Sequence, residues 1–136
     1  MGSKSNYLEN KLLDYVFGKT AFDPPGTIYA GLWTATLDDA STGATAGEVA
    51  GSGYARVAIV NGTADWDAAS GGTKSNTNVV NFGTAGADWG TVTDFALLDA
   101  NSEGNILYFG ALTASKVISN GDSATIAAGA LDITED

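Results

Sequence analysis

Two aspartates flank a tryptophan in the segment Asp65-Trp66-Asp67, which comes nearer to catalytic chemistry than the rest of the chain. Residues i and i+2 of an extended segment point the same way, so the two carboxylates share one side. Paired carboxylates can hydrolyse glycosidic bonds, and a tryptophan ring can stack on a sugar. The segment lies in a polar stretch, however, where such aspartates are usually solvated charges. We therefore expect no catalytic residues here.

Residues 71–75 (GGTKS) superficially resemble a phosphate-binding loop. That loop requires a glycine immediately before its lysine, and Thr73 stands there instead of a glycine. No strong helix pattern follows that could present its N-terminus to a phosphate. The segment is therefore interpreted as a flexible turn, and no nucleotide is expected as a cofactor.

Residues 99–104 (DANSEG) match the first half of a calcium-binding loop. An EF-hand needs a bidentate glutamate at its twelfth position, and that position is Gly110. Both flanking segments have the pattern of strands, so we interpret residues 99–104 as a hairpin loop rather than a metal site.

The chain contains no histidine and no cysteine among its 136 residues. It thus lacks the most common general base, the most common zinc ligand and every thiolate. Serine-hydrolase and zinc-hydrolase activities become improbable, and disulfides are excluded. We expect a protein that is not an enzyme and that needs no metal or cofactor.

The three tryptophans are candidate anchors, either for a core or for a contact surface. Trp33 alternates within a predicted strand, which favours burial. Trp66 and Trp89 lie in segments rich in glycine and aspartate, so both are candidate partner or ligand contacts.

Residues 6–17 show the one clear helical period. Asn6 can cap this helix with Glu9 three residues later, and Gly18 is a natural stop. Its apolar face either packs on the domain or docks on a neighbouring subunit, with a loose arm in front of it. The candidate contacts on this segment are Tyr7, Leu8, Leu12, Tyr15 and Val16.

From residue 27 onward the apolar period changes from 3.6 to 2, which indicates strands. Glycine-rich turns separate about seven or eight short segments, which favours an antiparallel β-sandwich or barrel in one domain. In this division residues 1–26 form an arm and a helix, and residues 27–136 form the sandwich. The predicted strands are residues 27–36, 54–60, 77–82, 92–98, 105–113, 116–119, 123–127 and 131–134, with a tight turn at residues 120–122.

The net charge is −10, from six basic and sixteen acidic residues. Such a field repels nucleic acid and anionic lipid, so neither is an expected partner. No apolar run reaches the length of a membrane span, and the polar N-terminus lacks the apolar region of a signal peptide. We expect the chain to be made in the cytosol of the cell that produces it.

Segments along nearly the whole chain resemble a family of small tailed-phage proteins, often labelled tail-fibre-like. The resemblance lies in residues 5–14 (SNYLENKLLD), residues 27–29 (TIY) with Leu32 and Thr34, and residues 53–57, 87–93, 107–112 and 128–134. It brings no catalytic residues with it.

The resemblance implies a structural component of a phage particle, located in the virion. Our leading hypothesis is a capsid decoration, or cement, protein that binds outside the shell and contacts the major capsid protein or other virion proteins. A homo-oligomer, such as a trimer at three-fold positions, would follow from the symmetry of the shell. The alternative is a tail-fibre or receptor-binding module whose exposed tryptophans contact host glycans.

Overall fold

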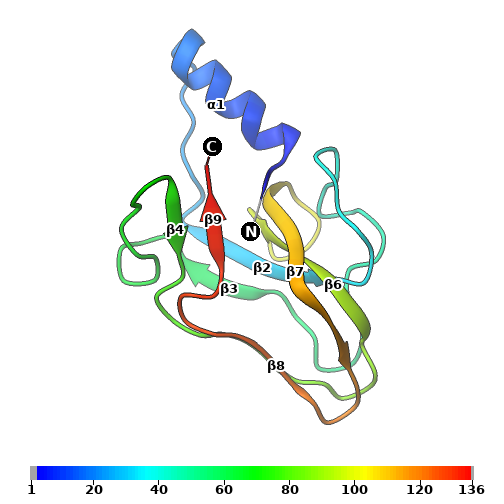
Figure 1. The fold of residues 1–136 in the computed structure, drawn as a ribbon. Coiled ribbons are helices and arrows are strands. Elements are labelled where there is room, and N and C mark those ends of the chain that lie inside the picture. The colour runs from blue at the N-terminus through cyan, green and yellow to red at the C-terminus, as the bar shows by residue number, and fades with distance from the viewer. Residues whose placement is uncertain (1–2, 136) are drawn as a thin grey trace.

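The computed structural model describes residues 3–135 as an antiparallel β structure with a helix close to its N-terminal end (Figure 1). The elements in chain order are β1 (Ser3–Lys4), α1 (Asn6–Gly18), β2 (Thr27–Trp33), β3 (Val57–Val60), β4 (Thr73–Ser75), β5 (Val80–Thr84), β6 (Gly90–Leu98), β7 (Ile106–Ile118), β8 (Ser123–Ile126) and β9 (Asp132–Thr134). The predicted fold class, mainly β with one N-terminal helix, is confirmed, and the sheets form an open arrangement rather than a closed barrel.

The largest sheet has five strands in the order β1-β7-β6-β2-β3, and every pairing is antiparallel. β2 lies between β6 and β3, with Ala30 opposite Leu97 on one side and Val57 on the other. β6 carries a continuous buried run from Asp94 to Leu98, because both faces of this sheet are covered. The apolar side chains of these strands therefore pack into two cores, one on each face of the sheet.

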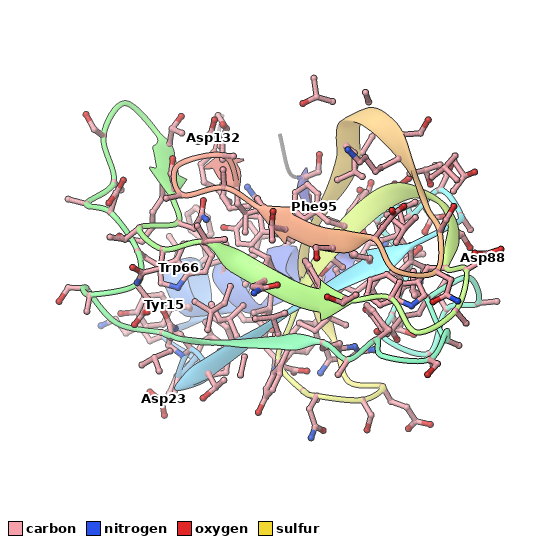
Figure 2. The ribbon with its side chains drawn as sticks, turned by 90° about the horizontal axis from the view of Figure 1, so that it is seen from below. Tyr15, Asp23, Trp66, Asp88, Phe95 and Asp132 are labelled. Carbon is pink, nitrogen blue, oxygen red and sulfur yellow. The ribbon has the colours of Figure 1, made fainter. Side chains whose placement is uncertain are left out.

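The larger core lies between the five-stranded sheet and two ribbons, β5–β8 and β4–β9 (Figure 2). Phe95 is at its centre, and Phe82 of β5 and Ile133 of β9 approach from the ribbons. A second cluster forms on the opposite face of the same sheet around Trp33, which is completely buried. Leu37 covers it from the loop after β2, and its backbone N–H donates to the buried carboxylate of Asp94 at 3.2 Å.

The N-terminal residues join the sheet instead of forming a loose arm. Ser3 pairs with Phe109 and Lys4 with Tyr108, so β1 is an edge strand on β7. The sheet thus begins before residue 27, contrary to the predicted division between an arm and a sandwich. The predicted arm also includes residues 1 and 2, which lie outside the described residues.

Helix α1 is capped by Ser5 rather than by the predicted Asn6. The buried Ser5 hydroxyl accepts from the backbone N–H of Leu8 at 3.3 Å and donates to the carbonyl of Ile106. Serine holds this position because one hydroxyl can serve the helix end and the neighbouring strand together. The helix ends at Gly18, as expected, and Lys19 takes the left-handed conformation (φ 54°) that closes the last turn.

Several strand boundaries differ from the prediction. β2 ends at Trp33 rather than at residue 36, and β3 begins at Val57 rather than at residue 54. The residues just before β3, Tyr54 and Arg56, instead bond to Glu48 in the preceding loop. The segments at 105–113 and 116–119 form one strand, β7, with a bulge. Residues 71–75 were expected to be a turn; the glycines turn there, and residues 73–75 form β4 against β9.

Candidate assembly surface

The structure buries Trp66 and Trp89, so the prediction that they form an exposed contact surface is wrong. Each side chain is only 5% exposed, and both belong to the larger core. The Trp89 ring meets the Tyr54 ring edge-on at 5.4 Å, and its indole N–H donates to the carbonyl of Ser52 at 3.0 Å. The nearby glycines suggested an exposed loop, but they make room for the buried ring. At Gly51, a Cβ atom would lie 2.3 Å from the Trp89 ring, so only glycine leaves space for it.

The aspartates beside Trp66 hold their own loop together. Asp65 accepts from the side-chain amide of Asn78 at 3.1 Å, and Asp67 accepts from the hydroxyl of Thr77 at 2.9 Å. The tryptophan between them points into the core and leaves no open ring for a sugar. Figure 2 labels Trp66 at this edge of the β layers.

A buried ion pair between Arg56 and Glu48 fastens three loops to one another. The Arg56 side chain is 2% exposed and donates to both carboxylate oxygens of Glu48 at 2.7 Å. It also lies over the Trp33 ring, 5.7 Å from the ring centre. Its remaining hydrogen bonds go to the backbone carbonyls of Gly43, Ala100 and Glu103. Every donor of this charge is used within the chain, so its role is internal.

Tyr54 also bonds to Glu48 of this ion pair, from the side of the larger core. Its hydroxyl donates to Glu48 at 3.0 Å and accepts from the backbone N–H of Leu32 at 2.9 Å. Burial is the main cause that raises the pKa of Tyr54 above its ordinary value of 10.0, and the neighbouring Glu48 raises it further. The phenol is therefore neutral at physiological pH and acts as a hydrogen-bonding strut.

The two ends of the described chain meet in a small polar cluster. Glu135 accepts hydrogen bonds from the Lys4 ammonium and the Tyr108 hydroxyl, the latter at 2.5 Å. Burial raises the pKa of Glu135, but the bonds from Lys4 and Tyr108 outweigh it, so the net shift is downward. This cluster joins the end that follows β9 to the edge of the central sheet (Figure 1).

The first half of α1 packs on its own chain. Leu8 is 5% exposed, and Leu12 is half-buried. Tyr7 is also half-buried, with the Lys11 ammonium 5.7 Å from its ring centre. Leu8 is therefore unavailable to a partner in this structure, which contradicts its place among the candidate contacts.

The second half of α1 extends away from the β layers (Figure 1). It exposes large apolar side chains. Two of them, Tyr15 and Val16, are predicted contacts and are 56% and 62% exposed. Two others were missed: Leu13 is 55% exposed and Phe17 is 83% exposed. Their spacing of i and i+4 marks them as neighbours on one helix face, and that signal was available in the sequence.

We call Leu13, Val16 and Phe17 the helix tip. These three side chains line a shallow groove together with Leu12, Glu9 and Lys4. Residues i, i+3 and i+4 of a helix form one continuous strip, so the exposed area is contiguous. An exposed contiguous apolar strip is the usual mark of an interaction surface.

A hollow of about 500 Å³ opens at the corner between β7 and β8. Residues 119–122 turn as predicted, with the Ser119 N–H donating to the Asp122 carboxylate at 2.9 Å. The strands on either side of this turn do not pair with each other, because β7 pairs with β6 while β8 pairs with β5. The two strands therefore separate as they leave the turn.

Within residues 3–135, no group of three acidic or other metal-ligating side chains is arranged to hold a metal ion. No helix in the same part of the chain is both long and apolar enough to cross a membrane.

A search of curated proteins finds no match to this sequence. A comparison with protein families matches residues 3–134 to the family described as "Podophage GP4 fiber I protein gp80". The match includes every strand and the helix, so the earlier resemblance to small tail-fibre-like phage proteins is confirmed. The chain belongs to the podophage GP4 fiber I protein gp80 family, a family of phage fibre and virion structural proteins.

Proposed function

We propose that this protein is a structural subunit of a phage tail fibre that works by holding neighbouring virion proteins together. The observation that carries the proposal is the helix tip, an exposed apolar strip on a domain that buries its three tryptophans and pairs Arg56 with Glu48 internally. The fibre description of the family supports the same role.

A fibre subunit needs a rigid body and a contact surface. The sheets and the first half of α1 form the body, and the second half of α1 provides the contact surface. The body is fixed by two cores and by the ion pair between Arg56 and Glu48. The helix tip is held away from it by the capped, packed first half of α1. Phe17 exposes 83% of its surface, and burying an aromatic ring at an interface is strongly favourable.

Glycan recognition through Trp66 and Trp89 is not part of this proposal, because both rings are buried. The protein would therefore support a fibre rather than read a receptor through its tryptophans. Capsid decoration remains the rival hypothesis. One argument for it weakens, since Ser3 and Lys4 pair with the protein's own β7 and are not free to reach across a capsid joint.

We also propose that the protein is not an enzyme. Asp65 and Asp67 are engaged by Asn78 and Thr77, and these bonds give the carboxylates a structural task. Its expected partners are other virion proteins and further copies of itself.

Imaging of labelled particles tests the proposal. A particle carrying a gold-binding tag on this protein should show gold at the tail appendages in negative-stain micrographs. Gold spread over the capsid would instead support the decoration hypothesis and overturn the fibre assignment.

A variant pair separates attachment from folding in the same particles. Phe17→Asp should lower the number of labelled copies per particle. Val60→Asp is the matched control, because Val60 is 61% exposed on the edge strand β3, away from α1. Equal incorporation of the two variants would remove the helix tip from the attachment surface.

A further inference from the structure

We propose that this protein binds a neutral sugar in a polar pocket beside the hairpin loop of residues 99–104. The inference goes beyond the proposed fibre function and involves none of the residues of the helix tip. The pocket has a volume of about 570 Å³, within the range of roughly 300–1,000 Å³ that is typical of small-ligand sites. We call it the hairpin pocket, and the residues of its wall that could meet a ligand are Tyr29, Glu48, Arg56, Asn101, Ser102 and Glu103.

The hairpin that forms one wall of the pocket is held in place at both ends. At its base, the Asp99 carboxylate accepts from the backbone N–H of Asn105 at 2.7 Å and from the Asn105 side-chain amide at 2.8 Å. From inside, Arg56 donates to the carbonyls of Ala100 and Glu103, both at 2.8 Å. A ligand that enters the pocket therefore does not have to order this loop, and that saving favours binding.

Arg56 provides no free donor for an anionic ligand. A guanidinium has five N–H donors, and here two of them donate to Glu48 while the others donate to backbone carbonyls. A phosphate or carboxylate group would instead meet the carboxylates of Glu48 and Glu103. The net charge of −10 also repels anions over longer distances. The pocket is therefore unsuited to an anion.

Glu48 presents an oriented acceptor to the pocket. An ionised carboxylate has about four acceptor positions, and its Oε1 atom accepts from Arg56 Nε and from the Tyr54 hydroxyl. Its Oε2 atom accepts from Arg56 Nη2, which leaves one position on Oε2 for a ligand. The Glu48 side chain keeps 24% of its surface exposed. Because Arg56 fixes the carboxylate through two bonds, a ligand hydroxyl would meet Oε2 in a defined direction.

The hairpin wall supplies groups of mixed hydrogen-bonding character. Asn101, Ser102 and Glu103 are exposed, and all three line the pocket. An amide and a hydroxyl can each donate and accept, whereas a carboxylate accepts. Tyr29 of β2 adds a half-buried ring that packs against the second core. A sugar suits this combination, because its hydroxyls both donate and accept while its C–H face can pack on an aromatic ring.

An organic ammonium ion is the nearest competitor for this pocket. Such a group only donates, so the N–H donors of Asn101 would find no acceptor on it. The charge of Glu48 is already balanced by Arg56. The other carboxylate, that of Glu103, is exposed to solvent, where pairing with a cation contributes little. These charges favour a neutral ligand over a cation.

Saturation-transfer NMR of the full chain tests the assignment. The probes are the methyl glycosides of glucose, galactose, mannose, rhamnose and N-acetylglucosamine, and we expect transfer to at least one of them. In ¹H–¹⁵N spectra, the amide signals of residues 101–103 should shift when that glycoside is added. The amide signals of residues 13–17, which include the helix tip, should stay in place.

Substitutions in the hairpin make the test specific. Asn101→Ala removes one hydrogen-bonding group and should weaken glycoside binding about fivefold. Ser102→Trp fills the pocket and should abolish binding. Both positions are exposed, so both variants should fold, and their melting temperatures check this. Asn10→Ala, at an exposed position of α1 outside the pocket, is the matched control and should bind like the unmodified chain.

Several results would overturn the proposal. One is the absence of transfer to every glycoside, and another is glycoside binding that Ser102→Trp leaves unchanged, which places the sugar elsewhere. Methylammonium chloride and sodium phosphate serve as charged probes in the same spectra. Shifts of residues 101–103 that are larger with either salt than with any glycoside would assign the pocket to a charged ligand. Because these measurements do not involve the helix tip, a negative result leaves the fibre assignment intact.

Discussion

The central sheet and helix α1 use apolar side chains in opposite ways. In β6 five consecutive residues, from Asp94 to Leu98, are buried by their own chain. In the second half of α1, Leu13, Val16 and Phe17 are more than half exposed. The sheet satisfies itself because each of its faces has a covering layer, whereas only the first half of α1 has one. An apolar pattern therefore marks a core in one region and a contact surface in the other.

Among substitutions in the sheet, Trp33→Ala should destabilise the fold most. The Trp33 side chain is completely buried and donates to the carbonyl of Thr45 at 3.1 Å. Its removal leaves a cavity under the loop after β2 and should lower the free energy of unfolding by about 3–5 kcal/mol. Urea denaturation followed by tryptophan fluorescence measures the change, and a loss under about 1 kcal/mol would mean that the second core contributes little.

The helix contains both behaviours, and a pair of substitutions separates them. Leu8→Asp places a charge where the side chain is 5% exposed, and it should destabilise the fold by about 3 kcal/mol. Leu13→Asp, at a 55% exposed position on the same helix, should change stability by less than about 0.5 kcal/mol. Thermal denaturation of the isolated protein compares them. Equal melting temperatures would show that the first half of α1 does not belong to the core.

A substitution of Arg56 tests whether the loops held by its ion pair with Glu48 are stabilised by the geometry of its hydrogen bonds or by its charge alone. Arg56→Lys keeps the charge but loses the two-pronged contact with Glu48 and several bonds to loop carbonyls. Buried acceptors left without donors should reduce the free energy of unfolding by about 2 kcal/mol. Chemical denaturation gives the value, and Lys116→Arg at an exposed position serves as the control. An unchanged midpoint for Arg56→Lys would assign the stabilisation to charge alone.

The smallest effect is expected at the cluster that joins the chain ends. The pKa of Glu135 is lowered by Lys4 and Tyr108, so its contribution is present above its ordinary pKa of 4.5 and is lost as pH falls below that value. Because Glu135 is exposed, Glu135→Gln should cost less than about 1 kcal/mol at pH 7. The difference from the unmodified chain should vanish near pH 3. Melting temperatures measured between pH 7 and pH 3 follow it, and a gap that persists at low pH would assign the effect to packing.

The sequence by itself determined the elements and the general class. The period of 2 from residue 27 and the period of 3.6 over residues 6–17 depend only on local chain geometry, and both predictions are confirmed. The turns at residues 99–104 and 120–122 also form, since glycine, asparagine and aspartate favour turns wherever they lie. The resemblance to a tail-fibre-like phage family was likewise present in the residues.

Only the tertiary structure decided which side chains are covered. Trp66 and Trp89 sit among polar and glycine residues, yet strands distant in sequence close over them. The same holds for the pairing of Ser3 with Phe109 and for the bond from Arg56 to the carbonyl of Ala100, 44 residues away. It also decided that residues 119–122 turn a corner between two sheets and that Phe17, not Leu8, faces outward. Burial depends on what the rest of the chain brings to a surface, and local periodicity carries no information about those distant residues.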